Sequence, residues 1–162
     1  MHIRDANARD AAAIAAIYNP FVRNSAISFE EAEVSADAMQ DRMADVQAAN
    51  LPWLVACVND VVIGYAYATK WRVRHAYRFS VETSVYIDGA QSGLGRGTAL
   101  YTAFLQRLRL AGCHLAIGGI ALPNVASVAL HEKMGYRKAA HFEEVGFKFG
   151  RWHDVGYWQC KL

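Results

Sequence analysis

Three glycines fall within five positions of the stretch SGLGRGT (residues 92–98), directly before a run that is typical of a helix. Glycine inside a helix or strand lowers stability by about 0.5–1 kcal/mol relative to alanine, so three glycines this close together indicate a specific structural or functional requirement. A loop that leads into a helix N-terminus presents free N–H groups and roughly half a positive charge, which favour phosphate or pyrophosphate. The stretch therefore predicts a phosphate-binding loop to which Arg96 adds a full charge. An ordinary tight turn is the alternative.

Two common types of phosphate loop do not fit this stretch. No Gly-Lys-Ser/Thr follows the glycines, as a Walker A loop requires. The glycines also do not follow the first strand of a βαβ unit with an acidic residue about 20 positions further on, as a dinucleotide-binding fold requires. A phosphate ligand of another kind is left.

Two residues have side chains suited to proton transfer. Glu82 stands with Thr83 and Ser84 inside an otherwise apolar strand, where a merely solvated carboxylate is not expected. A carboxylate at its reference pKa of about 4.3 is a poor base for an α-amino group near 7.7–8.0, so this role needs a raised pKa or a relay through water. His131, with a reference pKa of about 6.5, can accept or return a proton at neutral pH. A histidine that only packs or caps its helix is the alternative.

The stretch WRVRHAYR (residues 71–78) places three arginines and two aromatic residues just before the strand that carries Glu82. Arginine binds carboxylate or phosphinate groups through two parallel hydrogen bonds. The stretch therefore predicts a substrate loop for a small anionic molecule, with a solvated basic loop as the alternative. The histidines show no spacing typical of metal ligands, so no metal is expected. His153 and Asp154 are neighbours in an expected strand and point to opposite faces, so we expect no catalytic dyad.

Length and composition limit the class of protein. A chain of 162 residues suits a single domain, residues 1–162. The formal net charge of +2 is too mild for a nucleic-acid surface, and no stretch approaches the roughly 18 consecutive apolar residues of a membrane span. Cys57, Cys113 and Cys160 are odd in number and widely spaced, so we expect reduced thiols and no disulfide framework. The first residues lack the apolar core of a signal peptide, and we expect a cytoplasmic protein.

Hydrophobic periodicity and turn residues predict the secondary structure. The expected strands are residues 3–6, 51–58, 61–71, 80–88 and 113–121, and two more within 136–162. The expected helices run from an Asn7 cap through Phe21, from a Ser35 cap to about residue 49, from Thr98, which caps or opens the helix, to 110, and from 125 to 134. This order predicts an α+β fold with a central, mostly antiparallel mixed β-sheet flanked by helices on both faces. Strands 80–88 and 113–121 form the expected parallel pair.

Several longer stretches are more specific than the glycines. They are Ile3-Arg4, Ile14-x-x-Ile17-Tyr18-Asn19, Val81-Glu82-x-Ser84-Val85-Tyr86-Ile87, Pro123-Asn124-x-x-Ser127 and Phe149-Gly150-Arg151-Trp152-His153-Asp154. In these stretches the chain resembles the Gcn5-related N-acetyltransferases (GNAT superfamily), within them the group of phosphinothricin and methionine sulfone or sulfoximine acetyltransferases. The resemblance covers nearly the whole chain and implies a GNAT-like fold.

The resemblance also implies site residues and a cosubstrate. In this family a loop of the pattern Gln/Arg-x-x-Gly-x-Gly/Ala holds the pyrophosphate of acetyl-CoA, and Ser92 here replaces the usual Gln or Arg. The implied coenzyme-binding residues are Val85, Tyr86, Ile87, Gly93, Leu94, Gly95, Arg96, Gly97, Thr98 and Asn124. Glu82 matches the catalytic glutamate, and His131 matches a catalytic histidine of the phosphinothricin group. The implied substrate-binding residues are Phe29, Arg72, Arg74, Tyr77 and Val155.

These features predict an enzyme that moves acetyl from acetyl-CoA to the α-amino group of a small amino acid or analogue. The stretch NSAISF (residues 24–29) departs from the Ile-Trp-Asn pattern of the sulfone and sulfoximine branch, which favours a phosphinothricin-like acceptor. An acetyltransferase for a peptide or polyamine amine and a non-enzymatic acyl-CoA-binding module are the alternatives. The resemblance further implies a homodimer.

Overall fold

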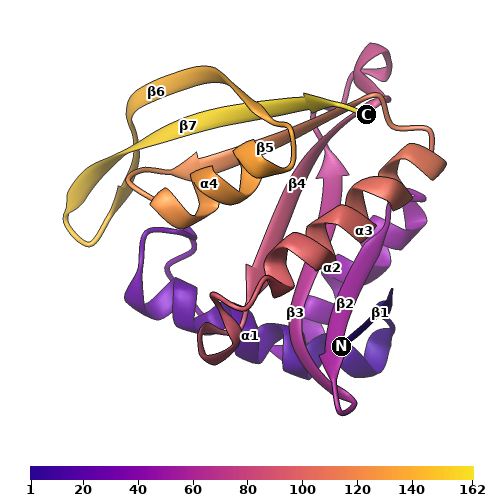
Figure 1. Cartoon of the computed structure of the whole chain (residues 1–162). Coiled ribbons are helices and arrows are strands. Elements are labelled where there is room, and N and C mark those ends of the chain that lie inside the picture. The colour runs from indigo at the N-terminus through magenta and orange to yellow at the C-terminus, as the bar shows by residue number, and fades with distance from the viewer.

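The computed structural model describes residues 1 to 162, and its strands and helices follow the predicted order (Figure 1). The elements are β1 (His2–Asp5), η1 (Ala8–Asp10), α1 (Ala11–Asn24), α2 (Ala36–Ala48), β2 (Trp53–Val58), β3 (Val61–Lys70), η2 (His75–Tyr77), β4 (Ser80–Ile87), η3 (Gly89–Gln91), α3 (Arg96–Leu110), β5 (Leu115–Ala121), α4 (Val125–Lys133), β6 (Arg137–Lys148) and β7 (Arg151–Lys161). Short 3-10 turns, labelled η, are the additions to the prediction. No helix has both the length and the apolar character that crossing a membrane needs.

The start of the first helical segment is fixed by local polar groups, as the sequence predicts. The Arg9 N–H donates to Asn7 Oδ1 at 3.0 Å, and the Asn7 N–H donates in turn to Asp10 Oδ2 at 2.9 Å. Arg4 of β1 donates to both oxygens of Asp10, at 2.7 and 2.8 Å, which ties the strand to the helix start. The structure divides this segment into a 3-10 turn, η1, and the helix α1.

One seven-stranded sheet runs through the molecule in the order β1-β2-β3-β4-β5-β7-β6. All neighbouring strands are antiparallel except β4 and β5, which confirms the predicted mixed sheet and its one parallel pair. Asn59 and Asp60 close the β2–β3 hairpin with φ values of 48° and 63°, the left-handed backbone of a two-residue hairpin turn.

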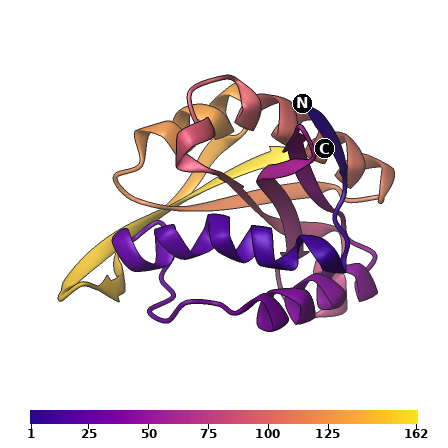
Figure 2. The ribbon, with the colours of Figure 1, turned by 90° about the horizontal axis from the view of Figure 1, so that it is seen from below.

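Helices cover both faces of this sheet. In the two views, α1 and α2 lie on one face and α3 and α4 on the other (Figures 1 and 2). Each face has its own buried apolar cluster: Leu100, Phe104 and Leu108 of α3 belong to one, and Ile14 and Val22 of α1 belong to the other. The predicted arrangement of helices on both faces is confirmed.

The parallel pair of strands separates soon after it forms. Strand β4 pairs with β5 only from Ser80 opposite Leu115 to Glu82 opposite Ile117, although both strands continue for several residues. At this point the Thr83 hydroxyl donates to the Ile117 carbonyl at 3.2 Å and takes the place of a ladder bond. From Thr83 onward, the edge of β4 that faces β5 therefore has no strand partner.

The predicted start of α3 is wrong. Thr98 neither caps nor opens the helix, which begins at Arg96 after an N-cap at Gly95 and has no side-chain cap. Gly95 has φ 73°, in the left-handed region that glycine adopts without strain, so backbone conformation determines this start. The strand limits also move, because β5 begins at Leu115, after Cys113, and β2 begins at Trp53, after Leu51.

The Asn7 cap can be tested by substitution. We expect Asn7→Ala to lower the free energy of unfolding by about 1 kcal/mol, because the Arg9 amide loses its acceptor. Urea denaturation measures this change. Asn24→Ala, at the exposed end of α1 where the side chain makes no hydrogen bond, serves as the control and should change stability by less than about 0.5 kcal/mol. Equal effects of the two substitutions would contradict the cap.

Candidate active site

The backbone between β4 and α3 leaves amide groups unpaired. Gly93 and Gly95 adopt φ values of 77° and 73°, and the N–H groups from Gly95 to Thr98 donate to no group of the protein. A helix start has such free amides unless a side chain caps it, and none does here. Free amides at the positive end of a helix dipole favour an anion. Leu94 in the same loop is 64% exposed.

Arg96 supplies a second, independent indication of an anion. Its Nη1 atom is shielded from solvent and has no hydrogen-bond partner. A buried guanidinium nitrogen without a partner is costly, so this atom needs an acceptor that the protein does not provide. The amides and Arg96 together fit a phosphate or pyrophosphate group.

A narrow cavity of about 50 Å³ lies where β4 and β5 separate. Its walls are Thr83, Ser84, Val85 and Tyr86 of β4, Gly119, Ile120 and Ala121 of β5, Asn124, Ser127 and His131 at and in α4, and Ile27. Asn124 accepts the Ser127 N–H with its side-chain oxygen, at 3.1 Å, which leaves its NH₂ group free to donate. Ile87 does not line the cavity and packs toward Gly64 and Gly97.

Glu82 lies on the face of the sheet that carries α1 and α2. Thr83 contacts Tyr101 of α3 on the opposite face, and side chains alternate along a strand. Burial raises the pKa of the Glu82 carboxyl above its ordinary value, and the positive charge of Arg72 acts in the opposite direction. This carboxylate is thus a stronger base than an exposed glutamate, as a proton acceptor for an amine requires.

His131 lines the cavity from the opposite face and is only 4% exposed. Its Nδ1 atom lies 2.8 Å from the Ser127 carbonyl, an acceptor, so the neutral ring carries its proton on Nδ1. Nε2 is left as an acceptor, 3.2 Å from the Tyr101 hydroxyl. Burial lowers the pKa of His131, while the bond to Ser127 acts in the opposite direction. The imidazole is therefore neutral at pH 7.

Buried hydroxyl groups surround Nε2 and form one connected cluster. Tyr101 lies 2.7 Å from the Thr83 oxygen and 2.9 Å from the Tyr136 oxygen, and Thr83 and Tyr136 are 3.1 Å apart. The bond from Thr83 to the Ile117 carbonyl joins this cluster to β5. A satisfied polar network of this kind holds the imidazole in one orientation.

Two adjacent glycines of β5 leave space for the side chains of Glu82 and His131. A Cβ at Gly118 would lie 2.6 Å from His131 Nε2, and a Cβ at Gly119 would lie 3.2 Å from Glu82 Oε1. Because successive residues of a strand face opposite sides, the two candidate catalytic groups approach the same short piece of β5 from opposite faces. The sequence analysis did not single out this pair, although glycines inside an apolar strand signal a close approach.

Three of the five predicted substrate residues come from the stretch 71–78, and only one of these three lies near Glu82. Arg72 stacks on Trp71 with 4.1 Å to the ring centroid, and its charge acts on both Glu82 and Tyr157, so its guanidinium lies near the Glu82 carboxylate. Arg74 and Tyr77, by contrast, lie exposed at and in the turn η2, and neither makes an ion pair or a hydrogen bond through its side chain.

The other two predicted substrate residues lie on or against the C-terminal hairpin. Phe29 packs over Gly146 and beside His153 of β6 and β7. Val155 is buried and pairs with Ala121 at the end of β5, next to the cavity.

Tyr157 lies beside Glu82, and the sequence analysis did not single it out. Its ring would lie 3.0 Å from a Cβ at Gly119, beside Glu82, and it packs edge-on against Trp71 and Phe142. These three aromatic rings form an apolar wall beside the Glu82 carboxylate and Arg72. Trp71 belongs to the predicted substrate loop, whereas Phe142 and Tyr157 alternate within strands and offered no signal that distinguishes them from ordinary core residues.

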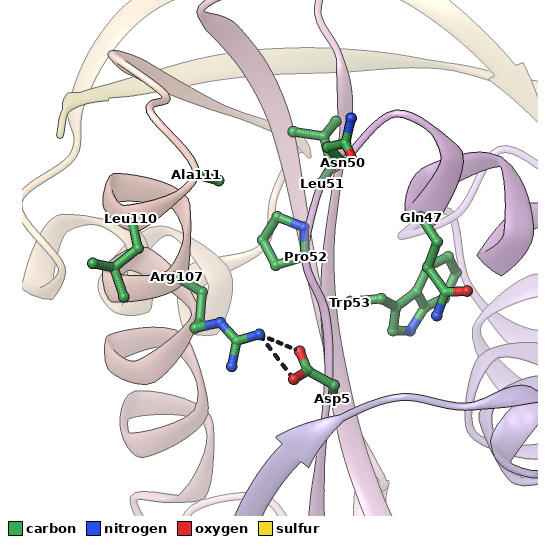
Figure 3. A pocket seen from close by; sticks show the side chains of 9 residues that line it. All are labelled: Asp5, Gln47, Asn50, Leu51, Pro52, Trp53, Arg107, Leu110 and Ala111. Atoms are coloured by element: carbon green, nitrogen blue, oxygen red, sulfur yellow. Dashed lines mark hydrogen bonds and ion pairs between the residues drawn. The ribbon is translucent and has the colours of Figure 1, made fainter.

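A larger hollow of about 380 Å³ lies elsewhere, between the end of α2 and the end of α3 (Figure 3). Arg107 Nη2 donates to both carboxylate oxygens of Asp5 there, at 2.6 and 2.8 Å. The two charged residues that line this hollow are therefore paired with each other. None of the predicted site residues lines this hollow. It is separate from the candidate active site.

On this α+β fold the unpaired amides, the separated strands and the buried carboxylate suit an anionic ligand bound beside a proton acceptor. Comparison with known proteins gives the class of protein. The model of the acetyltransferase (GNAT) domain matches residues 3–156. The chain belongs to this family of acetyltransferases.

Individual acetyltransferases are similar to this chain over nearly its full length. It is 39% identical to a phosphinothricin N-acetyltransferase of Streptomyces viridochromogenes, over 98% of this chain and 86% of the relative. It is 38% identical to an L-methionine sulfoximine/L-methionine sulfone acetyltransferase of Salmonella typhimurium, over 100% of this chain and 95% of the relative. A solved phosphinothricin acetyltransferase from Sinorhizobium meliloti in complex with acetyl-CoA superposes with a TM-score of 0.95 at 36% identity, over 99% of this chain and 88% of that one.

The room that Gly118 leaves for His131 can be tested. We expect Gly118→Ala to lower kcat for acetyl transfer by about tenfold or more, because the added methyl group displaces the imidazole. Thiol release from acetyl-CoA measures the rate. Gly89→Ala is the matched control, since a Cβ there meets nothing within 4 Å. A Gly118→Ala enzyme with unchanged kcat would show that the position of His131 does not matter to the reaction.

Proposed function

We propose that the protein transfers the acetyl group of acetyl-CoA to the α-amino group of a small amino acid or analogue that carries an anionic group. The observation that carries this proposal is the early separation of β4 and β5, which opens a cavity beside Glu82 and leaves an edge of β4 unpaired. A thioester that enters there has its carbonyl next to a buried carboxylate. Membership of the acetyltransferase family supports acetyl transfer as the reaction.

The residues present fit the coenzyme. The free amides from Gly95 to Thr98 and the unpartnered Nη1 of Arg96 would hold its pyrophosphate. The unpaired edge of Val85, Tyr86 and Ile87 would hold its pantetheine arm through backbone bonds, in the manner of an added strand. The Asn124 amide would donate to the same arm. Ser92 cannot replace a longer side chain on the phosphate, because its hydroxyl donates to the Gly89 carbonyl at 2.7 Å.

Glu82 acts first in the proposed reaction. An amino acid arrives as its ammonium form, and Glu82 accepts one proton from it, directly or through water, so that the nitrogen lone pair can attack the acetyl carbonyl. The new C–N bond forms as the C–S bond breaks. Glu82 then releases its proton to solvent.

His131 handles the second proton in this proposal. The nitrogen loses another proton when it becomes an amide, and the departing thiolate gains one. A neutral imidazole on the opposite side of the cavity can accept that proton and return it to sulfur. Burial keeps the pKa of His131 low, so the ring is available as an acceptor at pH 7.

Arg72 sets the class of acceptor. Its guanidinium beside Glu82 suits the carboxylate or phosphinate of an amino-acid analogue, while it would repel a second cationic amine of a polyamine. The relatives act, by their names, on phosphinothricin or on methionine sulfoximine and sulfone. These acceptors share an α-amino group and a tetrahedral polar side chain, and we propose the same class here, with the phosphinothricin-like branch favoured by residues 24–29.

We also propose a cytoplasmic homodimer. The β6–β7 hairpin exposes more than half of the side-chain surface of each of five apolar residues: Phe142, Val145, Phe147, Phe149 and Trp152. Such a patch on one hairpin supports pairing with a second copy of the chain. The cytoplasmic location is supported by the reduced cysteines and by the acetyl-CoA that the reaction consumes.

A thiol-release assay with acetyl-CoA and a panel of amino acids and analogues tests the function. We expect turnover with small anionic acceptors, phosphinothricin and methionine sulfoximine among them, and a loss of about 10²–10⁴-fold in Glu82→Gln. Glu132→Gln, on α4, is the control and should retain turnover. Coenzyme binding without thiol release from any acceptor would contradict the proposal and favour a binding module.

The pH dependence of kcat/KM tests the pair of Glu82 and Arg72. Glu82 must be ionised to accept a proton, so kcat/KM falls as the pH drops through its raised pKa. Arg72→Gln removes the charge that lowers this pKa, and we expect the acid limb to move to higher pH. Arg74→Gln should leave the limb in place. The acceptor amine is the same for all enzymes, so an unmoved limb in Arg72→Gln would contradict the assignment of the limb to Glu82.

A further inference from the structure

Lys148 at the end of β6 is buried in an unusual way. It is 2% exposed and forms no ion pair with any carboxylate. Its ammonium instead donates to three backbone carbonyls, those of Val22 at 2.7 Å, Ser25 at 2.8 Å and Ser28 at 2.7 Å. These three bonds use all the donors that an ammonium group has.

The three carbonyls belong to one short segment of the chain. Val22 is in the last turn of α1, and Ser25 and Ser28 lie in the connection that follows it. We call residues 25–29 the acceptor segment. In both views the chain after α1 lies next to the turn of the β6–β7 hairpin (Figures 1 and 2). Lys148 is therefore the polar link between the end of α1 and this hairpin.

The acceptor segment forms part of the site. Ile27 lines the cavity between β4 and β5, on the face of the sheet where Glu82 lies. Phe29 packs over Gly146, where a Cβ would come within 2.3 Å of its ring, and next to His153. The segment thus connects the cavity to the hairpin on which Lys148 stands.

The other hydrogen bonds of the segment join it only to itself and to α1. The Ile27 N–H donates to Ser25 Oγ at 3.3 Å and the Glu30 N–H donates to Ser28 Oγ at 3.1 Å. The Ser28 hydroxyl also meets the Tyr18 hydroxyl at 2.6 Å, which holds it to α1 alone. Among the hydrogen bonds of the segment, only those of Lys148 reach the C-terminal hairpin.

We propose that Lys148 is a positioning residue for the acceptor amino acid, because its ammonium fixes the acceptor segment and with it Ile27 and Phe29. This inference rests on the proposed function. Lys148 would thus affect binding of the acceptor amino acid without touching it. The coenzyme-binding amides lie on the other side of β4, in the start of α3, and do not depend on Lys148.

A lysine suits this position better than other residues. A glutamine at 148 has two N–H donors and a shorter stem, and a methionine has none. Loss of the ammonium would leave buried carbonyls without donors, which costs far more than an exposed bond is worth. Burial lowers the pKa of Lys148, while the charges of Glu31 and Glu30 act in the opposite direction.

The test compares steady-state kinetics of Lys148→Met and Lys148→Gln. We expect the acceptor KM of Lys148→Met to rise about tenfold or more, while the KM for acetyl-CoA stays within about twofold. Lys148→Gln should give a smaller rise. Lys161→Met, at the exposed end of β7, is the control and should change neither KM. A rise of both KM values together, or of neither in a folded enzyme, would overturn the proposal.

Hydrogen exchange separates this inference from the proposed function. We expect the amides of residues 25–30 to exchange faster in Lys148→Met than in the wild-type protein, with no change in the amides of α3. If the wild-type protein acetylates no amino acid, the proposed function fails, and the exchange result still decides the role of Lys148. Unchanged exchange in residues 25–30 would overturn it. Should Lys148→Met fail to fold, Lys148→Gln gives the same two readouts.

Discussion

The early separation of β4 from β5 determines the shape of the candidate site. A parallel pair that continued to the ends of both strands would bury the edge of β4 in a ladder and close the cavity beside Glu82. The hydrogen-bond ladder between β4 and β5 ends where the Thr83 hydroxyl donates to the Ile117 carbonyl. The free edge that results can pair with an extended ligand through backbone groups, which requires no particular side chains. The uncapped start of α3 follows the end of this edge and presents free N–H groups.

The same separation explains why the site has two chemically different sides. Glu82 faces α1 and α2 and is near Arg72, whose charge keeps the carboxyl pKa from rising further. His131 faces the buried hydroxyl cluster of Tyr101 and Tyr136 and is held neutral. Gly118 and Gly119 bring both groups to one point of β5 because they add no side chain on either face.

Local sequence signals were sufficient for most of the fold. Asn7, Ser35 and the pair Asn59-Asp60 begin or turn elements through bonds to their own neighbours, so their effects are visible in the sequence. The start of α3 was predicted wrongly because a threonine is a preferred cap, whereas the helix begins at a left-handed glycine. Glu82 and His131 were predicted as proton-transfer groups from their types and motifs, whereas the faces they occupy and the directions of their pKa shifts depend on the folded structure.

The order of the elements and the mixed sheet could be predicted from the sequence, because periodicity and turn chemistry act over a few residues. The proton-transfer and anion-binding groups remain predictions from residue types and motifs. Contacts between residues far apart in the chain could not be predicted in this way. Tyr157 meets Glu82 through the pairing of β7 with β5, and Lys148 reaches the Val22 carbonyl across 126 positions of sequence. Contacts of that range arise from the packing of the whole sheet, and no local pattern encodes them.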